Sequence, residues 1–173
     1  DDQGEIALCI LSAVNVGGLN DLGELESICD LAVRALEQII DYQDYPVKAA
    51  EVSTKRRRSL GIGYIGLAHY LAKHGVKYSD PKAWDLVDRL SEAFQYHLLR
   101  ASCNIAMEKG KCEGFDRTKY ADGLLPIDHY KKDVDKIVPH KQRMAWESLR
   151  KDIAKHGLRH STLSAQMPSE SSS

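Results

Sequence analysis

Short apolar runs alternate with amphipathic stretches along this chain of 173 residues, and this alternation limits the folds open to it. Residues 5–16 and 59–65 are rich in aliphatic and β-branched side chains, which is typical of buried strands. Residues 22–42 and 82–109 carry apolar side chains at helical spacing. Strands that alternate with helices favour βα units and a parallel sheet, so the sequence predicts an α/β fold.

Shorter elements complete the predicted order: helices at 66–74 and 145–156, a strand at 158–165, a loop made of Pro46 and the charged stretch 51–58, and irregular structure at 111–142. The helix at 82–109 is expected to bury one face, made of Trp84, Val87, Phe94, Leu98, Ala101 and Ile105. Three strands cannot close a sheet by themselves. We therefore expect the remaining strands to come from sequence outside this chain.

The bulk composition is that of one globular domain or a large part of one. Apolar residues make up 43% of the chain, and the net charge of −1 gives no general attraction to nucleic acid or anionic membranes. No apolar run approaches the roughly 20 residues of a membrane span. The four cysteines have wide, irregular spacings without a CxxC pair, which argues against a zinc site or a disulfide scaffold and favours a reducing, cytoplasmic location.

The last residues of the chain have the composition of a helix start. Pro168 is followed by Ser169, Glu170 and three further serines, and Ser169 has the side chain of an N-cap. Free backbone N–H groups and the helix dipole make such a start a site for phosphate. The body of the helix is absent and the chain has no initiator Met, so we expect an internal piece of a larger protein that ends inside a binding loop.

Gly61, Gly63 and Gly66 match the GxGxxG pattern of dinucleotide-binding proteins, and Asp85 follows at about the required distance. That motif needs an apolar strand directly before its first glycine, whereas the charged run 55–58 precedes it here. We therefore interpret the motif as a strand whose small residues permit close packing. Dinucleotide binding stays the weaker alternative.

Three further features carry less specific signals. Arg56, Arg57 and Arg58 form a basic run that we interpret as a solvated loop, with contact to a nucleotide phosphate or an acidic partner as the alternative. The seven histidines show no metal-ligand spacing, so we interpret them as surface or core residues. Cys9 lies inside the first predicted strand. Because strand ends converge on one site in α/β assemblies, it is a candidate functional residue as well as a candidate core residue.

Several segments, in one register over nearly the whole chain, resemble the large (catalytic) subunit of class I ribonucleotide reductase. The clearest match is residues 161–172, and the others are 4–17, 41–46, 57–63, 70–73, 78–80, 125–133 and 156–159. The resemblance implies a ten-stranded α/β barrel of parallel strands and connecting helices. Residues 1–173 would be an incomplete part of that catalytic barrel domain, without a separate second domain.

This family reduces ribonucleoside diphosphates to deoxyribonucleotides for DNA synthesis. The resemblance implies that a thiyl radical takes a hydrogen from the ribose, and that two cysteines supply two electrons. The 2′-hydroxyl then leaves as water and the cysteine pair becomes a disulfide. Cys9 matches one member of that pair, whose partner is expected outside this chain.

The substrate loop of the family matches the end of the chain. The matching residues are Pro168, Ser169, Glu170, Ser171 and Ser172. In the family, backbone N–H groups and hydroxyls of this loop hold the diphosphate, in agreement with the anion site inferred above. Ser171 replaces a threonine common in relatives, and the hydroxyl is kept.

Cys29, Cys103 and Cys112 match no redox role of the family, so we expect them to be packing residues. The thiyl cysteine, the second reducing cysteine, the effector-binding regions and the tail cysteines are expected outside this chain, which should therefore be inactive alone. No metal or other cofactor is expected in this chain. The family relies on a metal/tyrosyl radical in a separate small subunit and on ATP or dNTP effectors.

The expected partners follow from the same resemblance. They are the rest of the large subunit, the small radical-generating subunit, thioredoxin or glutaredoxin, and the ribonucleoside diphosphate substrate, with neither membrane nor nucleic acid among them. A second class of function stays open: a non-enzymatic module that holds an anion or nucleotide with the Ser169 loop. Such a module would tolerate Cys9→Ser, whereas a reductase would not.

Overall fold

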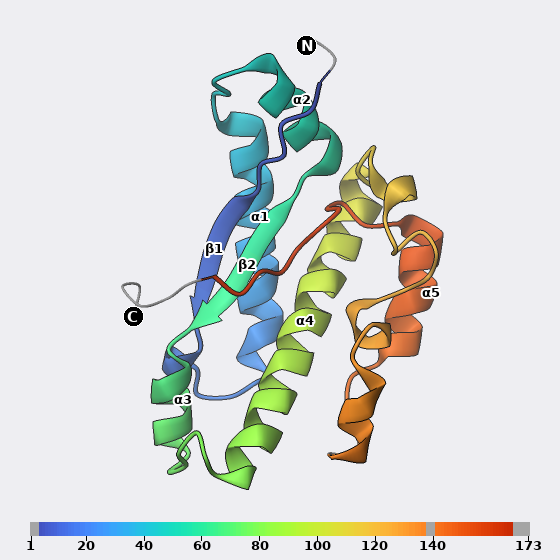
Figure 1. Ribbon diagram of the computed structural model, residues 1–173. Coiled ribbons are helices and arrows are strands. Elements are labelled where there is room, and N and C mark those ends of the chain that lie inside the picture. Colours follow the sequence, from blue (N-terminus) through green and yellow to red (C-terminus); the bar gives the residue numbers. More distant parts are fainter. Residues whose placement is uncertain (1–3, 138–140, 168–173) are drawn as a thin grey trace.

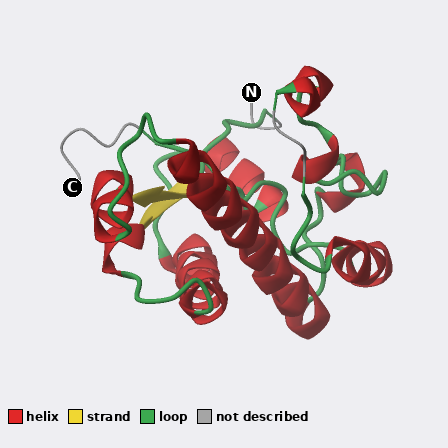
Figure 2. Cartoon of the chain, turned by 90° about the horizontal axis from the view of Figure 1, so that it is seen from below, coloured by secondary structure: helices red, strands yellow, loops and turns green. Residues whose placement is uncertain are grey.

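The computed structural model describes residues 4–137 and 141–167 (Figure 1). Its helices and strands are β1 (Ile10–Asn15), α1 (Glu24–Tyr42), α2 (Lys48–Arg57), β2 (Leu60–Ile65), α3 (Leu67–Lys73), α4 (Pro81–Lys109) and α5 (Trp146–His156). Short 3-10 turns lie at Val16–Gly18, Phe115–Arg117, Pro126–Asp128 and Lys132–Lys136. Figure 2 shows that the two strands form a small part of a molecule made mostly of helices.

The two strands run parallel, as the alternation predicted. Their register pairs Ile10 with Leu60 and Asn15 with Ile65, and α1 and α2 form the crossover between them. Alternate residues of a strand face opposite sides. One face of the sheet packs on α1. On that face the Tyr64 ring of β2 reaches α4 and meets Phe94 edge-on, with the ring centroids 5.5 Å apart. The α/β class is confirmed, with a parallel sheet of two strands in the described residues.

The predicted third strand is a different structure. Residues 158–167, which we name the closing segment, follow α5 and hydrogen-bond along β2, where Ile62 N–H donates to Leu163 O at 2.8 Å. The ladder amounts to one isolated parallel bridge, between Ile62 and Ser164. The expectation of a strand at 158–165 was wrong because the closing segment leaves the edge of β2 and crosses the outer face of the sheet (Figure 1).

The helical layer holds most of the core. Helix α4 packs against α1 on one side and α5 on the other. Of the residues expected on its buried face, Phe94, Leu98, Ala101 and Ile105 are buried. Trp84 is 55% exposed and Val87 is only partly buried, which corrects the expectation for these two residues. The first turns of α4 extend beyond the end of α1 (Figure 1). The apolar face expected for 145–156 is confirmed, since Trp146, Leu149 and Ile153 of α5 are buried.

Most helix boundaries agree with the periodicity, but α2 contradicts the loop expected at 51–58. Its buried side consists of Ala50, Ser53 and Thr54, so no apolar stripe reveals it in the sequence. Glu51 accepts hydrogen bonds from Lys48 and Lys55, three and four residues away along the helix. Such pairs support a helix. The charged stretch is therefore a helix made stable by local ion pairs and a small-residue face.

The first strand is shorter than the 5–16 expected, because it begins at Ile10. Residues before Ile10 have no strand to pair with, because β2 begins only at Leu60. The segment before β2 is helix α2, which ends at Arg58 with a left-handed backbone, φ 49°. Cys9 therefore lies directly before β1 and not inside it, which corrects the sequence-based placement.

Among the helices of the described ranges, none combines the length and apolar character that a bilayer crossing requires.

Candidate functional site

Cys9 is the exposed thiol of the chain, at the entrance to β1. The backbone is held on both sides of it. Ile10 N–H donates to Ser59 O at 3.2 Å, and Ile6 N–H donates to Ala49 O at 3.2 Å. The thiol is thus accessible to a reactant while its main chain is fixed by neighbouring elements.

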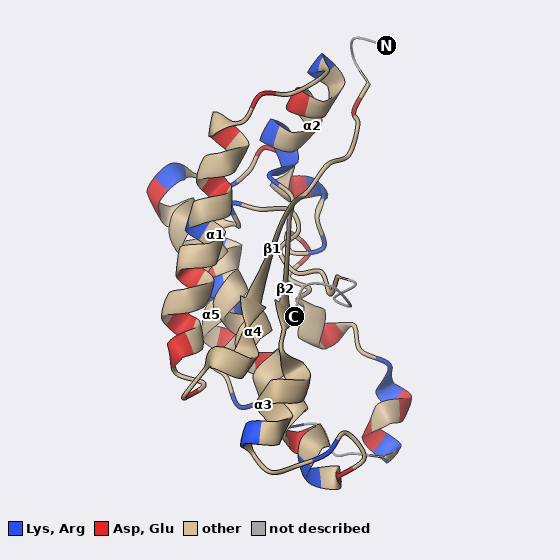
Figure 3. Cartoon of the chain, turned by 90° about the vertical axis from the view of Figure 1, so that its left-hand side faces the viewer, with Lys and Arg blue, Asp and Glu red and all other residues tan. Residues whose placement is uncertain are grey.

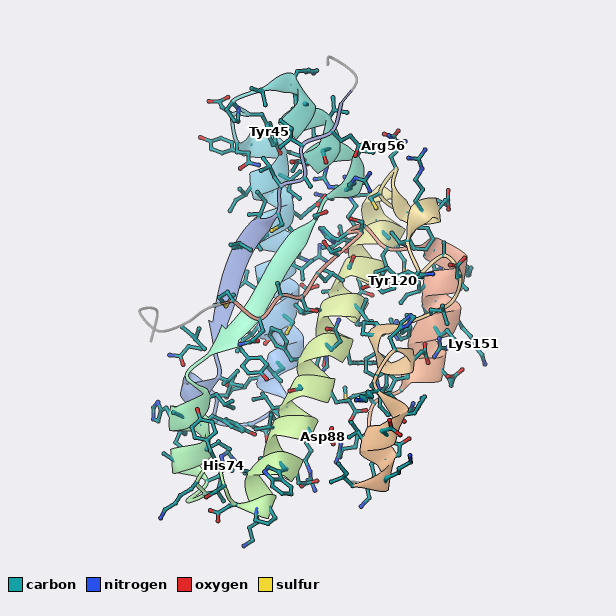
Figure 4. All side chains as sticks on the ribbon, in the orientation of Figure 1. Tyr45, Arg56, His74, Asp88, Tyr120 and Lys151 are labelled. Carbon is teal, nitrogen blue, oxygen red and sulfur yellow. The ribbon has the colours of Figure 1, made fainter. Side chains whose placement is uncertain are left out.

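The arginines at 56–58 include two that hold the chain just before Cys9, through Glu5. The carboxylate of Glu5 accepts hydrogen bonds from Arg56 at 2.9 Å and Arg57 at 2.7 Å. Hydrogen bonds from Arg57 and then Arg56 hold the pKa of Glu5 below its usual value. Figure 3 shows these basic residues gathered at the end of α2, and Figure 4 labels Arg56 there. The solvated-loop interpretation was wrong, because all three guanidinium groups bind carboxylates and Arg58 is only 4% exposed.

Gly61 and Gly63 form the floor of the candidate site. A Cβ built on Gly61 would lie 2.6 Å from Leu11 Cδ2, 3.4 Å from the Ala165 Cβ and 3.7 Å from the Cys9 Sγ. A Cβ on Gly63 would lie 2.5 Å from the Ala165 carbonyl oxygen, too close for any side chain. Gly63 therefore admits the closing segment, and Gly61 admits the Leu11 side chain, on the sheet face where the Cys9 thiol lies. We call the face of β2 formed by Gly61 and Gly63 the glycine floor.

This geometry decides between the two interpretations of the GxGxxG pattern. Gly61 and Gly63 lie within β2, where their lack of a side chain permits close packing, as predicted. Gly66 has a left-handed backbone, with φ 77°, and begins α3. The glycines of a dinucleotide-binding motif lie instead in the turn between a strand and a helix. The structure therefore contradicts the dinucleotide alternative.

The predicted substrate-loop residues Pro168, Ser169, Glu170, Ser171 and Ser172 lie outside the described residues. The residues that lead to this loop are described, up to Met167. Met167 lies on the glycine floor, with its Sδ 2.9 Å from the point where a Cβ on Gly63 would stand. The chain thus reaches residue 168 from a point above the same strand that contacts Cys9.

Polar contacts hold the closing segment close to its end. Ser164 Oγ donates to Gln95 Oε1 on α4 at 2.6 Å, and Gln166 Nε2 donates to Tyr64 O on β2 at 2.7 Å. These side chains line a pocket of about 200 Å³ beside the segment. A larger pocket of about 460 Å³ is lined by residues of α1 and α4 and by Gly23, away from the glycine floor.

A buried ionic cluster holds the start of the closing segment. Glu37 of α1 accepts hydrogen bonds from Arg58, Arg159 and His160 at 2.7, 2.8 and 3.0 Å. Burial alone would raise the pKa of Glu37, but these three donors outweigh it and hold the value at about 2. Burial lowers the pKa of His160, so its ring is neutral and Nδ1 accepts from the Ser102 hydroxyl at 2.9 Å.

Sequence reasoning missed this cluster. One signal was present: Glu37 falls on the apolar stripe of α1, among Val33, Leu36 and Ile40. A carboxylate on a buried helix face requires a partner. The partners could not be named, because they come from positions 58, 159 and 160.

Comparison with known proteins identifies the family. The family model for the ribonucleotide reductase barrel domain matches residues 1–173. The chain belongs to this family. It is 60% identical over its whole length to the ribonucleoside-diphosphate reductase subunit alpha of Haemophilus influenzae, and 43% identical over 99% of its length to that of Enterobacteria phage T4. Against ribonucleoside-diphosphate reductase 1 subunit alpha of Escherichia coli it is 56% identical over 78% of the chain.

The chain spans 23% of the Haemophilus relative, 22% of the phage relative and 18% of the Escherichia relative. The match to the barrel domain agrees with the parallel βα arrangement described above.

The other cysteines of this barrel-domain chain are unlike Cys9. Cys29, Cys103 and Cys112 are buried, which confirms them as packing residues. Burial raises the pKa of Cys29 to about 12 and that of Cys103 to about 11, and it also raises the pKa of Cys112. Thiolates are the reactive form, so these three thiols are inert at neutral pH. Within the described ranges, no three side chains of His, Cys, Asp or Glu gather to form a metal site.

Proposed function

We propose that residues 1–173 form part of the catalytic barrel domain of a ribonucleoside-diphosphate reductase large subunit. The reaction reduces ribonucleoside diphosphates to deoxyribonucleoside diphosphates for DNA synthesis. The observation that carries the proposal is the placement of the exposed Cys9 thiol and the closing segment on one glycine floor. Membership of the barrel-domain family and the names of the relatives support it. In the complete subunit the two described strands would belong to a ten-stranded barrel.

Cys9 is proposed as one of two redox cysteines, its partner lying outside residues 1–173. The pair delivers two electrons and two protons to the ribose. The C2′–O bond breaks, a hydrogen takes the place of the hydroxyl, and the oxygen leaves as water. The two sulfurs are left joined as a disulfide. A serine in place of Cys9 cannot be oxidised in this way.

The loop from Pro168 to Ser172 is proposed to bind the diphosphate. Its serine hydroxyls and backbone N–H groups suit phosphate oxygens. The position of Met167 supports this role, because Met167 lies on Gly63 and Cys9 lies near Gly61, two residues away on the same strand. A diphosphate held just beyond residue 167 would place the attached ribose on the sheet face where the Cys9 thiol lies.

The proposal includes the partners of a complete enzyme. These are the remaining part of the large subunit, a small radical-generating subunit, thioredoxin or glutaredoxin as the reductant, and ATP or dNTP effectors. The wide cysteine spacing supports a cytoplasmic location.

The experiment that tests the proposal is Cys9→Ser in the complete large subunit, assayed with its small subunit and a thioredoxin-type reductant. Turnover should fall by at least about a thousandfold, while nucleoside diphosphate still binds, because the loop is untouched. Cys112→Ser is the matched control: the same change at a buried thiol should leave turnover per folded molecule within about threefold. Retained turnover in Cys9→Ser would overturn the proposal and favour an anion-binding module.

A further inference from the structure

We propose that Glu37 is a positioning residue for this reaction, which fixes the closing segment over the glycine floor and so sets where the substrate diphosphate is held. The inference rests on the proposed function for its kinetic consequence. Its structural basis is independent of that function, because every contact involved lies within the described residues.

Glu37 joins three parts of the chain that are far apart in sequence. Its carboxylate, only 1% exposed, binds Arg58 at the start of β2 and both Arg159 and His160 of the closing segment. Asp41, one turn further along α1, accepts two more hydrogen bonds from Arg58, at 3.0 and 2.8 Å. The two guanidinium charges are thus balanced by two carboxylates.

The remaining polar groups of the cluster are also partnered. Ser102 of α4 accepts from the backbone N–H of His160 at 3.2 Å, and its own carbonyl oxygen accepts from the N–H of Arg159 at 3.3 Å. Arg159 also donates to the Gly110 carbonyl at 3.2 Å. A network whose buried members, Glu37, Arg58 and His160, are all partnered has one preferred geometry.

The cluster lies where the closing segment meets β2. Leu60 N–H donates to Thr162 O at 3.0 Å, and these residues follow Arg58 and His160 by two positions each. Ser161 N–H donates to Arg57 O at 2.9 Å in the same stretch. The Glu37 carboxylate therefore fixes both β2 and the closing segment where their first hydrogen bonds form. The register set there determines that Ala165 falls over Gly61 and Gly63.

Two roles for Glu37 can be told apart by experiment. A residue that only stabilises the fold would, when changed, lower the amount of active enzyme and leave the Michaelis constant of the remainder unaltered. A residue that positions the diphosphate-binding segment would raise KM for the nucleoside diphosphate and leave kcat nearly constant, because ground state and transition state lose the same contact.

The test uses Glu37→Gln in the complete large subunit with its small subunit and reductant. Glutamine keeps the shape and removes the charge that both arginines need. We expect KM to rise at least about tenfold with kcat within about threefold. Glu108→Gln is the control, because Glu108 also joins α1 to α4 through an arginine, Arg34, but is half exposed and does not contact the closing segment. It should change neither constant.

If Glu37→Gln does not yield folded protein, Ser102→Ala tests the inference instead, because it removes only the hydroxyl that binds His160. For this variant we expect a smaller rise in KM, of about threefold. An unchanged KM in the folded variants, with or without a lower kcat, would overturn the inference. Amide hydrogen exchange at 160–163 provides an activity-independent readout, which Glu37→Gln should accelerate at least about tenfold. Accelerated exchange in an enzyme whose Cys9→Ser variant is fully active would refute the proposed function and leave the positioning of the segment intact.

Discussion

The buried cluster around Glu37 and the open glycine floor beside Cys9 lie at opposite ends of the same closing segment and are built in opposite ways. In the cluster, Glu37 and His160 are almost fully buried and bind partners on several elements. On the floor, Cys9 is exposed and the strand carries glycines in place of side chains. The first region restricts position by burial, and in the second the missing side chains let Ala165 and Met167 lie directly against the strand.

This contrast indicates how a reactive thiol can be both accessible and well placed. An exposed site cannot be held by its own packing, so its geometry must come from elsewhere in the molecule. Here the closing segment is fastened at Arg159 and His160 and again by Ser164 and Gln166, and only then reaches residue 168. The predictions below disturb one region or the other, in decreasing order of expected effect.

The largest effect is expected in the cluster, from Arg58→Met. The change leaves Glu37 and Asp41 with one cation fewer in a buried setting, so the free energy of unfolding should fall by about 3–5 kcal/mol. Arg34→Met is the control, because Arg34 is 38% exposed and its ion pairs should be worth at most about 1 kcal/mol. Urea denaturation measures both. Equal losses would mean that the cluster is no stronger than a surface pair.

The same cluster should make stability depend on pH. The folded pKa of Glu37 is about 2 and its usual value is 4.5, so its contribution is complete above pH 4.5 and is lost as the pH falls towards 2. The loss is about 3 kcal/mol. The lowered pKa of His160 acts in the same direction below its usual value of 6.5.

Denaturation at several pH values, with Glu37→Gln as the reference, measures this term. The variant should show a flatter profile between pH 4.5 and 2 than the natural protein. Parallel profiles would show that Glu37 is not held ionised by the cluster.

A smaller effect is expected on the floor, from Gly63→Ala. The new methyl group would meet the Ala165 carbonyl at 2.5 Å, so the closing segment must shift, at a cost of about 1–3 kcal/mol. Gly18→Ala is the control, because a Cβ there meets nothing within 4 Å and should change stability by less than about 0.5 kcal/mol. A Gly63→Ala variant as stable as the control would mean that the segment does not cross β2 at this point.

The two regions also differ in how far they could be predicted from the sequence. Helical periodicity located α1, α4 and α5, and the run 59–65 located β2, because each buries an apolar face that repeats along the chain. The small residues of β2 predicted close packing. Helix α2 was missed because its buried face is small and polar.

The cluster was beyond sequence reasoning for another reason. Glu37 and Arg159 are separated by 122 positions, and no local pattern links them. Cys9 was selected through a resemblance and a general rule about strand ends, and its place relative to Gly61 required the fold. The closing segment was predicted to be a strand, and its crossing over the sheet depends on Gly63 together with the anchors at 159 and 160.

The most direct test of the shared floor is a crosslink between Cys9 and the closing segment. In the complete, reduced subunit, Ala165→Cys should be joined to Cys9 by a short reagent that links two thiols, because both side chains lie within 3.7 Å of one point above Gly61. Ser164→Cys, one residue earlier, should not react in this way, because Ser164 contacts Gln95 on α4 instead. Mass spectrometry of the joined peptides gives the answer. A crosslink at 165 and not at 164 is the predicted result; crosslinking at 164 alone, or equally at both, would contradict the account.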